Sequence, residues 1–170
     1  MSTHDWTKFT KRINIQAAPQ DIYNAWTTRN NIEGWFLRSS QFTDKSDTLR
    51  QCDDAIHAGD TYKWMWHGFT NCVVEDGKIL EANGKDTIKF TFAGPPDSPM
   101  IVTVKITKEK GESIVTLTQE NIPLDDDGRM NFHVGCGDGW TFYLVNLKSI
   151  LEGGIDLRNK NEKLTKVINS

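Results

Sequence analysis

Large apolar residues recur at a helical spacing near the C-terminal end of the chain, between Gly135 and Leu151. At a helical pitch, one side of this stretch carries Trp140, Tyr143, Leu144, Leu147, Ile150 and Leu151, while Thr141, Lys148, Ser149 and Glu152 fall on the other. Asp138 and the nearby glycines suit the start of a helix, and Gly153 and Gly154 suit its end. The pattern predicts a long amphipathic helix whose apolar side needs a partner.

Most of the chain before this helix alternates between apolar and polar residues, which is typical of strands with one solvent-exposed face. The clearest case is 61–68, where Tyr62, Trp64 and Trp66 share a face. Further strands are expected at 9–17, 41–43, 72–75, 79–82, 87–92, 101–107 and 113–119. Asp76 and Gly77, like Asn83 and Gly84, are expected to form hairpin turns or bulges.

Two short helices are expected between the first and second strands, one beginning at Pro19 and one covering Ile32 to Phe36. Residues 124–131 are expected to form an acidic loop. The segment after Gly154 is polar, with only a few apolar residues available to pack: Ile155, Leu157, Leu164, Val167 and Ile168. This order of elements predicts an α+β fold, in which roughly six antiparallel strands curve around the long C-terminal helix.

Composition places the chain among globular proteins with one domain, because 170 residues allow a full core and 37% of them are apolar. The core is expected at about 8–158, followed by a polar tail at 159–170. The net charge of −3 and the scattered basic residues argue against a nucleic-acid partner. No stretch is apolar enough to predict membrane insertion or a signal for export, and three widely spaced cysteines favour reduced thiols in the cytoplasm.

Several short motifs follow one another in an order that resembles a known family. They are Ala18-Pro19 with Ile22, Ala25 and Trp26; Trp35-Phe36; Gly59 with 62–66; 77–81; 87–92; and Gly139-Trp140 with Leu144, Leu147, Leu151 and Glu152. Together they resemble the START-like (SRPBCC) superfamily and, within it, the family named after the C-terminal domain of the activator of the ninety-kilodalton heat-shock protein ATPase. The resemblance covers most of residues 8–158. It implies a helix-grip fold, with a sheet of six or seven strands wrapped around the long helix and a cavity between them.

Aromatic residues are the main candidates for a binding site. A sheet that curls around a helix leaves a gap at its wide end, and large side chains of both elements are placed to line it: Trp35, Trp64, Trp66, Phe90, Phe92, Trp140, Tyr143, Leu144 and Leu147. The prediction is a pocket for a small hydrophobic or aromatic ligand, and the resemblance implies the same, since family members bind lipids or other hydrophobic molecules. The alternative is that these rings fill the core completely.

Metal and cofactor sites are not predicted. His133 lies three residues from Cys136, and Cys52 lies five from His57, but a structural zinc site needs four such ligands in paired spacing. The run from Asp125 to Gly128 lacks the later ligands of a calcium loop and is expected to be a solvated acidic turn. The glycines at 135, 137 and 139 lack dinucleotide-binding spacing. By alternation, His67 is expected to point away from the aromatic face.

No catalytic residue is predicted, because the chain has no nucleophile motif and its carboxylates lie at strand ends or among polar neighbours. Two alternatives to simple ligand binding follow from the resemblance: a chaperone accessory protein, or an enzyme like the polyketide cyclases. The latter would need a polar dyad inside the cavity. Phe142 and Val145 fall outside the main apolar arc of the long helix, which raises the hypothesis of a homodimer.

Overall fold

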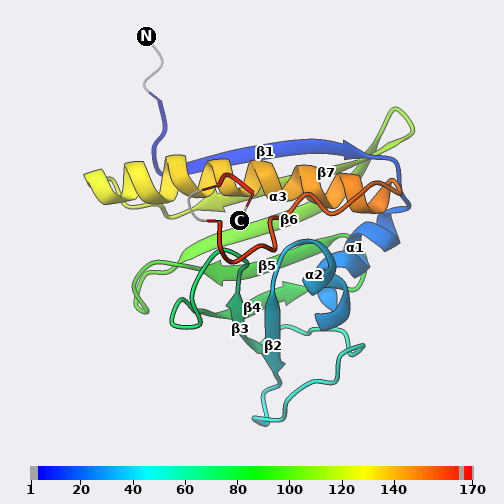
Figure 1. Ribbon diagram of the computed structural model, residues 1–170, viewed down its shortest axis with the longest axis horizontal. Helices are drawn as coiled ribbons and strands as arrows, with labels where there is room; N and C mark the ends of the chain where they lie inside the picture. Colours follow the sequence, from blue (N-terminus) through cyan, green and yellow to red (C-terminus); the bar gives the residue numbers. More distant parts are fainter. Residues whose placement is uncertain (1–3, 165–166, 170) are drawn as a thin grey trace.

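The computed structural model describes residues 4–164 and 167–169, and its main element is a seven-stranded antiparallel sheet in the order β1-β7-β6-β5-β4-β3-β2 (Figure 1). The elements are β1 (Lys8–Ile15), α1 (Pro19–Thr27), α2 (Arg29–Trp35), β2 (Ser39–Thr43), β3 (Thr61–Met65), β4 (Glu75–Ala82), β5 (Thr87–Phe92), β6 (Met100–Glu109), β7 (Glu112–Glu120), the π-helical segment η1 (Gly128–Gly135) and α3 (Cys136–Leu151). The predicted α+β, helix-grip fold is confirmed.

The long helix α3 lies across the sheet, alongside β1 (Figure 1). Its apolar side is buried as the periodicity predicts, with Trp140 at 3% and Leu147 at 0% exposure. The strands supply the opposing layer through their inward residues, among them Val104, Val115 and Leu117. The core therefore sits between one helix and the concave side of one sheet.

The predicted helix is confirmed as α3 at Cys136–Leu151, but the segment before it is helical as well. Helical backbone already begins at Asp126, and η1 leads directly into α3, so that Asp138 lies well inside the helical stretch. The reason is local capping, because the Asp125 side chain accepts the Gly128 N–H at 2.7 Å. A Cβ on Gly128 would lie 2.0 Å from the Pro123 carbonyl oxygen, so only glycine fits there. The expected acidic loop is thus largely a helix start.

The predicted turn at Asp76 and Gly77 is also wrong. Both residues lie within β4, where they pair with Lys63 and Tyr62 of β3, and residues 72–74 belong to the loop before it. Glycine is needed because a Cβ on Gly77 would come within 2.3 Å of the Tyr62 ring. The Tyr62 hydroxyl crosses this position to donate to the Thr91 carbonyl at 2.6 Å. Close ring packing, rather than a turn, explains this glycine.

Two further boundaries differ from the predicted ones. Helix α2 begins at Arg29, ahead of the start expected at Ile32, because the Thr28 hydroxyl accepts the Asn31 N–H and caps the helix. Strand β3 ends at Met65, so the alternation predicted through Gly68 stops earlier. Residues 66–74 form a loop, so strand alternation does not set the direction of His67, which lies half-buried there.

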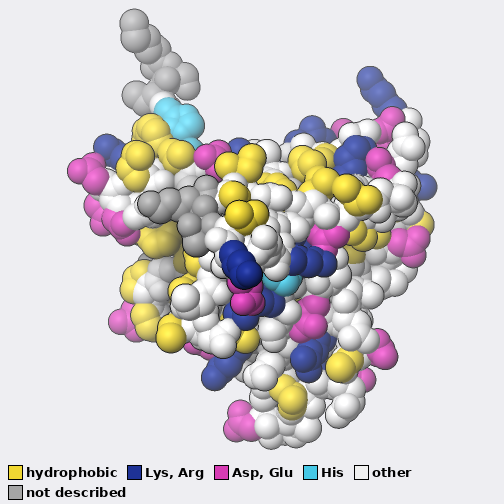
Figure 2. All heavy atoms as spheres, in the orientation of Figure 1, with side chains coloured by type: hydrophobic (Ala, Val, Ile, Leu, Met, Phe, Trp, Pro, Cys, Tyr) yellow, Lys and Arg dark blue, Asp and Glu magenta, His cyan; other side chains and the backbone are white. Residues whose placement is uncertain are grey.

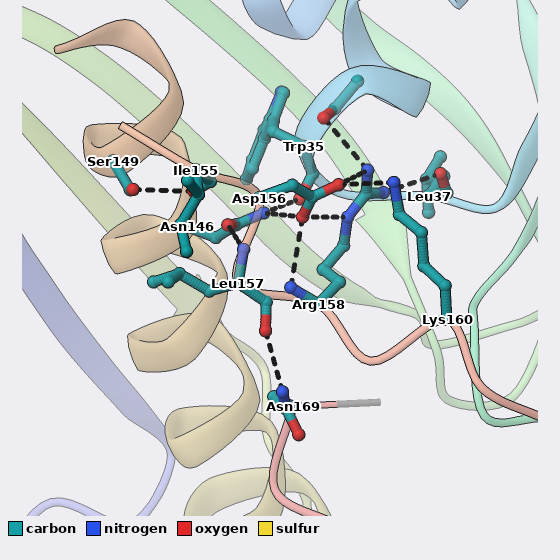
Figure 3. Close-up of polar contacts among 11 residues, drawn as sticks. Trp35, Leu37, Asn146, Ser149, Ile155, Asp156, Leu157, Arg158, Lys160 and Asn169 are labelled. Carbon is teal, nitrogen blue, oxygen red and sulfur yellow. Dashed lines mark hydrogen bonds and ion pairs between the residues drawn. The ribbon is translucent and has the colours of Figure 1, made fainter. Parts of the chain in front are cut away.

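The segment after α3, residues 155–160, forms a strap tied down by polar rather than apolar contacts (Figure 3). Arg158 is 7% exposed and donates to the carbonyls of Gly34 and Leu37 at 2.9 Å each. From α3, the Asn146 side chain donates to the Trp35 carbonyl at 2.6 Å and accepts the Leu157 N–H at 2.8 Å. The apolar Ile155, by contrast, is 73% exposed. The strap therefore caps the end of α2 and joins it to α3.

Candidate ligand-binding site

A mainly apolar cleft of about 460 Å³ opens between the first half of α3 and the loop 66–74. Its walls come from α3 and η1, from the ends of β4 and β5, and from Phe36 after α2; the lining residues are Phe36, Trp66, Phe69, Val73, Glu75, Phe92, Ala93, Phe132, Cys136, Gly139, Trp140 and Tyr143. Figure 2 shows hydrophobic side chains at the left of the viewed face, where Figure 1 places η1 and the loops that follow β3 and β5. The cleft is open to solvent rather than sealed.

Phe36 organises the floor of the cleft. Its ring stacks on Trp140, with centroids 5.1 Å apart, and meets the edges of Tyr143 at 4.8 Å and Trp66 at 5.7 Å. Trp140 also contacts Phe92 at 5.3 Å. Such tilted and edge-to-face contacts hold rings in defined orientations, so the apolar surface is preformed.

A buried amide sets the orientation of Trp140. The Trp140 indole N–H donates to the Gln119 side-chain oxygen at 2.9 Å, and the Gln119 amide nitrogen donates to the Met100 sulfur at 3.3 Å. Gln119 is fully buried on β7, where its amide would be costly without partners. The indole nitrogen is therefore satisfied within the protein, and Trp140 presents only its apolar ring to the cleft.

Glu75 and Cys136 are among the residues that bring polar groups to the cleft. Burial raises the pKa of the Glu75 carboxyl, and the hydrogen bond that Glu75 accepts from the Ala93 N–H only partly opposes this. Burial likewise raises the pKa of the Cys136 thiol. A thiol with a raised pKa is a poor nucleophile, whereas a carboxyl with a raised pKa stays protonated over a wider pH range, in which it can donate a hydrogen bond to a ligand. The lining thus suits binding better than covalent chemistry.

The nine residues predicted for the pocket divide into two groups. Four of them line the cleft: Trp66, Phe92, Trp140 and Tyr143. The other five are packed into the core with at most 2% exposure and do not line the cleft: Trp35, Trp64, Phe90, Leu144 and Leu147. Trp35 and Leu147 instead border a separate hollow among α1, α2 and α3. The sheet closes tightly on the helix over most of its length and leaves space only at one end.

Sequence reasoning missed several cleft residues: Phe36, Phe69, Val73, Glu75, Phe132 and Cys136. Phe69 and Val73 are 51% and 45% exposed in a polar loop. Apolar residues outside any periodic element were the available sign of such a site, because a loop has no reason to retain them for packing. Glu75 and Cys136 gave no comparable sign.

Neither His133 with Cys136 nor Cys52 with His57 belongs to a larger group of candidate metal ligands among the described residues. Among residues 4–164 and 167–169, no group of three or more His, Cys, Asp or Glu side chains is placed to hold a metal ion. His133 instead packs beside the rings of Trp6 and Phe9, and its Nε2 lies 3.3 Å from that of His4. In the part of the chain that the structure describes, no helix has the length and apolar character needed to cross a membrane.

Solved structures similar to this chain share the fold. The Aha1 dimer from Colwellia psychrerythraea has 24% identity and a TM-score of 0.65 over 86% of this chain and 97% of that one. SSP2350 from Staphylococcus saprophyticus has 16% identity and a TM-score of 0.65, covering 89% and 96% of the two chains. CalU16 from Micromonospora echinospora has 15% identity and a TM-score of 0.60, covering 88% and 76%. A comparison with curated proteins finds no significant match.

A family model described as "Activator of Hsp90 ATPase homolog 1-like protein" matches residues 16–152. The match runs from the end of β1 to the end of α3 and includes the whole lining of the cleft. It agrees with the START-like fold of the structural neighbours. The chain therefore belongs to the family of Activator of Hsp90 ATPase homolog 1-like proteins.

Proposed function

We propose that this protein binds a small hydrophobic or aromatic ligand in the cleft beside Trp140. The observation that carries the proposal is an open, preformed apolar surface whose rings are held by one another and by Gln119. Exposed apolar side chains cost free energy in water unless something covers them, which favours a hydrophobic occupant. The fold family commonly binds hydrophobic ligands, which supports the same function.

The ligand would lie between Trp66 and Trp140, against the ring of Phe92. Glu75 is a polar group placed to orient it, since one carboxylate oxygen is engaged by the Ala93 N–H and burial raises the pKa of the carboxyl. A neutral carboxyl donates to a carbonyl or ether oxygen. The three free cysteines, of which Cys52 and Cys72 are exposed, support a cytoplasmic location for this binding.

A cleft-filling variant tests the proposal. Gly139 lies on α3 and lines the cleft, and a Cβ added there meets no atom within 4 Å. Gly139→Phe should therefore place a ring in the cleft without disturbing the helix. We expect it to abolish the fluorescence gain of Nile red, an uncharged hydrophobic dye, that the unmodified protein produces. Native mass spectrometry of freshly purified protein would show whether a small molecule accompanies it.

Val145→Phe is the matched control, because Val145 lies on the solvent-exposed side of the same helix at 44% exposure. It adds an aromatic ring to α3 but leaves the cleft unchanged, so dye binding should persist. Equal dye binding by Gly139→Phe and the unmodified protein would rule out the cleft as the binding site.

A chaperone accessory role is a second candidate, favoured by the family description. If it holds, the purified protein should change the rate of ATP hydrolysis by the ninety-kilodalton chaperone. An unchanged rate, together with no co-purification of the chaperone, would rule out this role.

The solved Aha1 from Colwellia psychrerythraea is a dimer. We infer by analogy a homodimer of this chain through exposed apolar residues such as Val145, and sedimentation analysis of Val145→Glu would test it.

A further inference from the structure

A second hollow, of about 400 Å³, adjoins the cleft at Phe69, which lines both. Its other walls are polar and come from Arg38, from the loop 67–71 and from Lys160 and Glu162 beyond the strap. Trp66 and His67 are neighbours in the chain, yet Trp66 lines the cleft and His67 lines the hollow. An apolar chamber and a charged one therefore meet across a single phenyl ring.

Arg38 is a half-buried cation whose hydrogen-bond acceptors among the described residues are all neutral. Its Nε donates to the Trp66 carbonyl at 3.2 Å, its Nη1 to the Asn71 side-chain oxygen at 2.9 Å and its Nη2, weakly, to the Met65 sulfur at 3.9 Å. Among the described residues, no carboxylate forms an ion pair with it. A half-buried guanidinium retains donors suited to an oxyanion, so this position has the chemistry of an anion site.

The strap brings a second cation to the same hollow. Lys160 lies 2.8 Å from Asp156, and Asp156 also pairs with the buried Arg158 (Figure 3). Because Arg158 is anchored to the carbonyls of Gly34 and Leu37, the backbone before Lys160 is held firmly. Figure 2 shows basic, acidic and histidine side chains gathered near the centre of the viewed face. The anchored strap thus places Lys160 at the edge of the hollow.

His67 reports the electrostatic potential in the hollow. Burial lowers the pKa of His67, and the positive charges of Arg158, Lys160 and Arg38 lower it further, with Asp156 acting in the opposite direction. The cations therefore outweigh Asp156 at the position of this imidazole. Glu162 also lines the hollow and is the acidic side chain that an incoming anion would meet.

We infer that the ligand of this protein is an amphipathic oxyanion, with an apolar body in the cleft and a carboxylate or phosphate head against Arg38 and Lys160. This inference rests on the proposed function of the cleft and adds the charge of the ligand. The body would cross Phe69, whose ring is 51% exposed and belongs to both chambers. Charge-assisted hydrogen bonds to the head would then add to the burial of the tail.

Calorimetric titration with octyl phosphate, octanol and inorganic phosphate tests this inference. Octyl phosphate should bind at least about tenfold more tightly than octanol, since one hydrogen bond to a charged group contributes enough free energy for that ratio of dissociation constants. Arg38→Gln should abolish this advantage and leave octanol binding unchanged. Lys160→Gln should reduce the advantage without touching the loop, because its side chain is 55% exposed and pairs only with Asp156 among the described contacts. Lys105→Gln, an exposed position on β6 away from the hollow, is the matched control.

Each outcome distinguishes the inference from the proposed function. If octanol and octyl phosphate bind equally, and Arg38→Gln changes neither, the cleft binds neutral ligands and the inference is wrong. If inorganic phosphate binds as tightly as octyl phosphate, the hollow is a separate site for free anions, and the link to the cleft is wrong. If neither octyl compound binds, the proposed function and the inference fail together.

Discussion

Trp64 and Trp66 are two residues apart, yet they lie in different surroundings. Trp64 is 1% exposed, stacks on Tyr62 with ring centroids 3.8 Å apart and meets the edge of Phe90 at 5.2 Å. Trp66 lies just past the end of β3, is half-buried and lines the cleft.

Strand β5 repeats the contrast, with Phe90 buried at 1% and Phe92, its last residue, lining the cleft. The cleft opens where strands end, because paired strands bring the sheet onto the helix and loops do not. The same alternation of residues can therefore produce core in one place and the lining of an open cleft in the next.

The largest expected effect comes from deleting the packed ring. Trp64→Ala should lower the free energy of unfolding by about 3–5 kcal/mol, because it leaves a cavity among buried rings. Trp66→Ala should cost only about 1 kcal/mol, since one side of that ring already faces the cleft. Urea unfolding of both variants measures the difference. Equal losses would contradict the division between core and cleft.

The strap supports the cleft from behind, because Arg158 holds the carbonyl of Leu37, which follows the floor residue Phe36. Arg158→Met should lower the free energy of unfolding by about 3 kcal/mol, since it breaks a buried ion pair. Arg12→Met, which removes an exposed pair with Glu109, should cost no more than about 1 kcal/mol. Comparable losses in urea unfolding would show that the strap is not an anchor.

The same anchor predicts a pH dependence. Burial raises the pKa of Asp156, but the hydrogen bonds from Arg158 and Lys160 outweigh it and hold the pKa well below 3.8. Because the pKa of Asp156 is lower in the folded state than in the unfolded one, Asp156 stabilises the folded protein above pH 3.8. This stabilisation is lost as the pH falls further. Asp156→Asn should therefore flatten the acid limb of a stability profile, and an unchanged profile would argue against this ion pair.

A substitution at Gly77 tests how tightly the packed region is filled. Gly77→Ala should lower the free energy of unfolding by about 1–3 kcal/mol, because the added methyl group would displace the ring of Tyr62 and the tryptophan stacked on it. Gly34→Ala is the control, since its Cβ meets no atom within 4 Å on α2. It should raise stability by up to about 1 kcal/mol. Tolerance of Gly77→Ala would mean that the ring moves freely.

The smallest expected effect concerns Glu75 at the cleft. Because burial raises the pKa of this carboxyl, Glu75 destabilises the folded protein as the pH rises through the folded pKa and has no such cost in acid. Glu75→Gln should therefore stabilise the protein more at pH 7 than at pH 4. The measurement is the difference in the free energy of unfolding between the variant and the unmodified protein at each pH. The same difference at both pH values would mean that Glu75 is well hydrated.

Much of the fold could be predicted from periodicity. The 3.6-residue repeat in α3 and the alternation in β5, β6 and β7 report which side chains avoid water, and these elements were predicted in place. Features that depend on one atom of a distant residue could not be predicted. The sequence around Gly77 predicts a turn, whereas the structure shows that Tyr62 lies over this glycine. The sequence around Asp125 predicts a loop, whereas its carboxylate accepts the Gly128 N–H at the start of a helix.

For the candidate site, the sequence by itself determined that aromatic rings would gather between the C-terminal helix and the sheet, since periodicity and ring content are local properties. Only the tertiary structure decided which rings remain uncovered, because that depends on where β3 and β5 end and on how Phe36 enters from α2. It also decided that Arg38 and Lys160, more than a hundred residues apart, border one hollow. Exposure and charge neighbourhood are properties of the packed chain, and no repeat in the sequence encodes them.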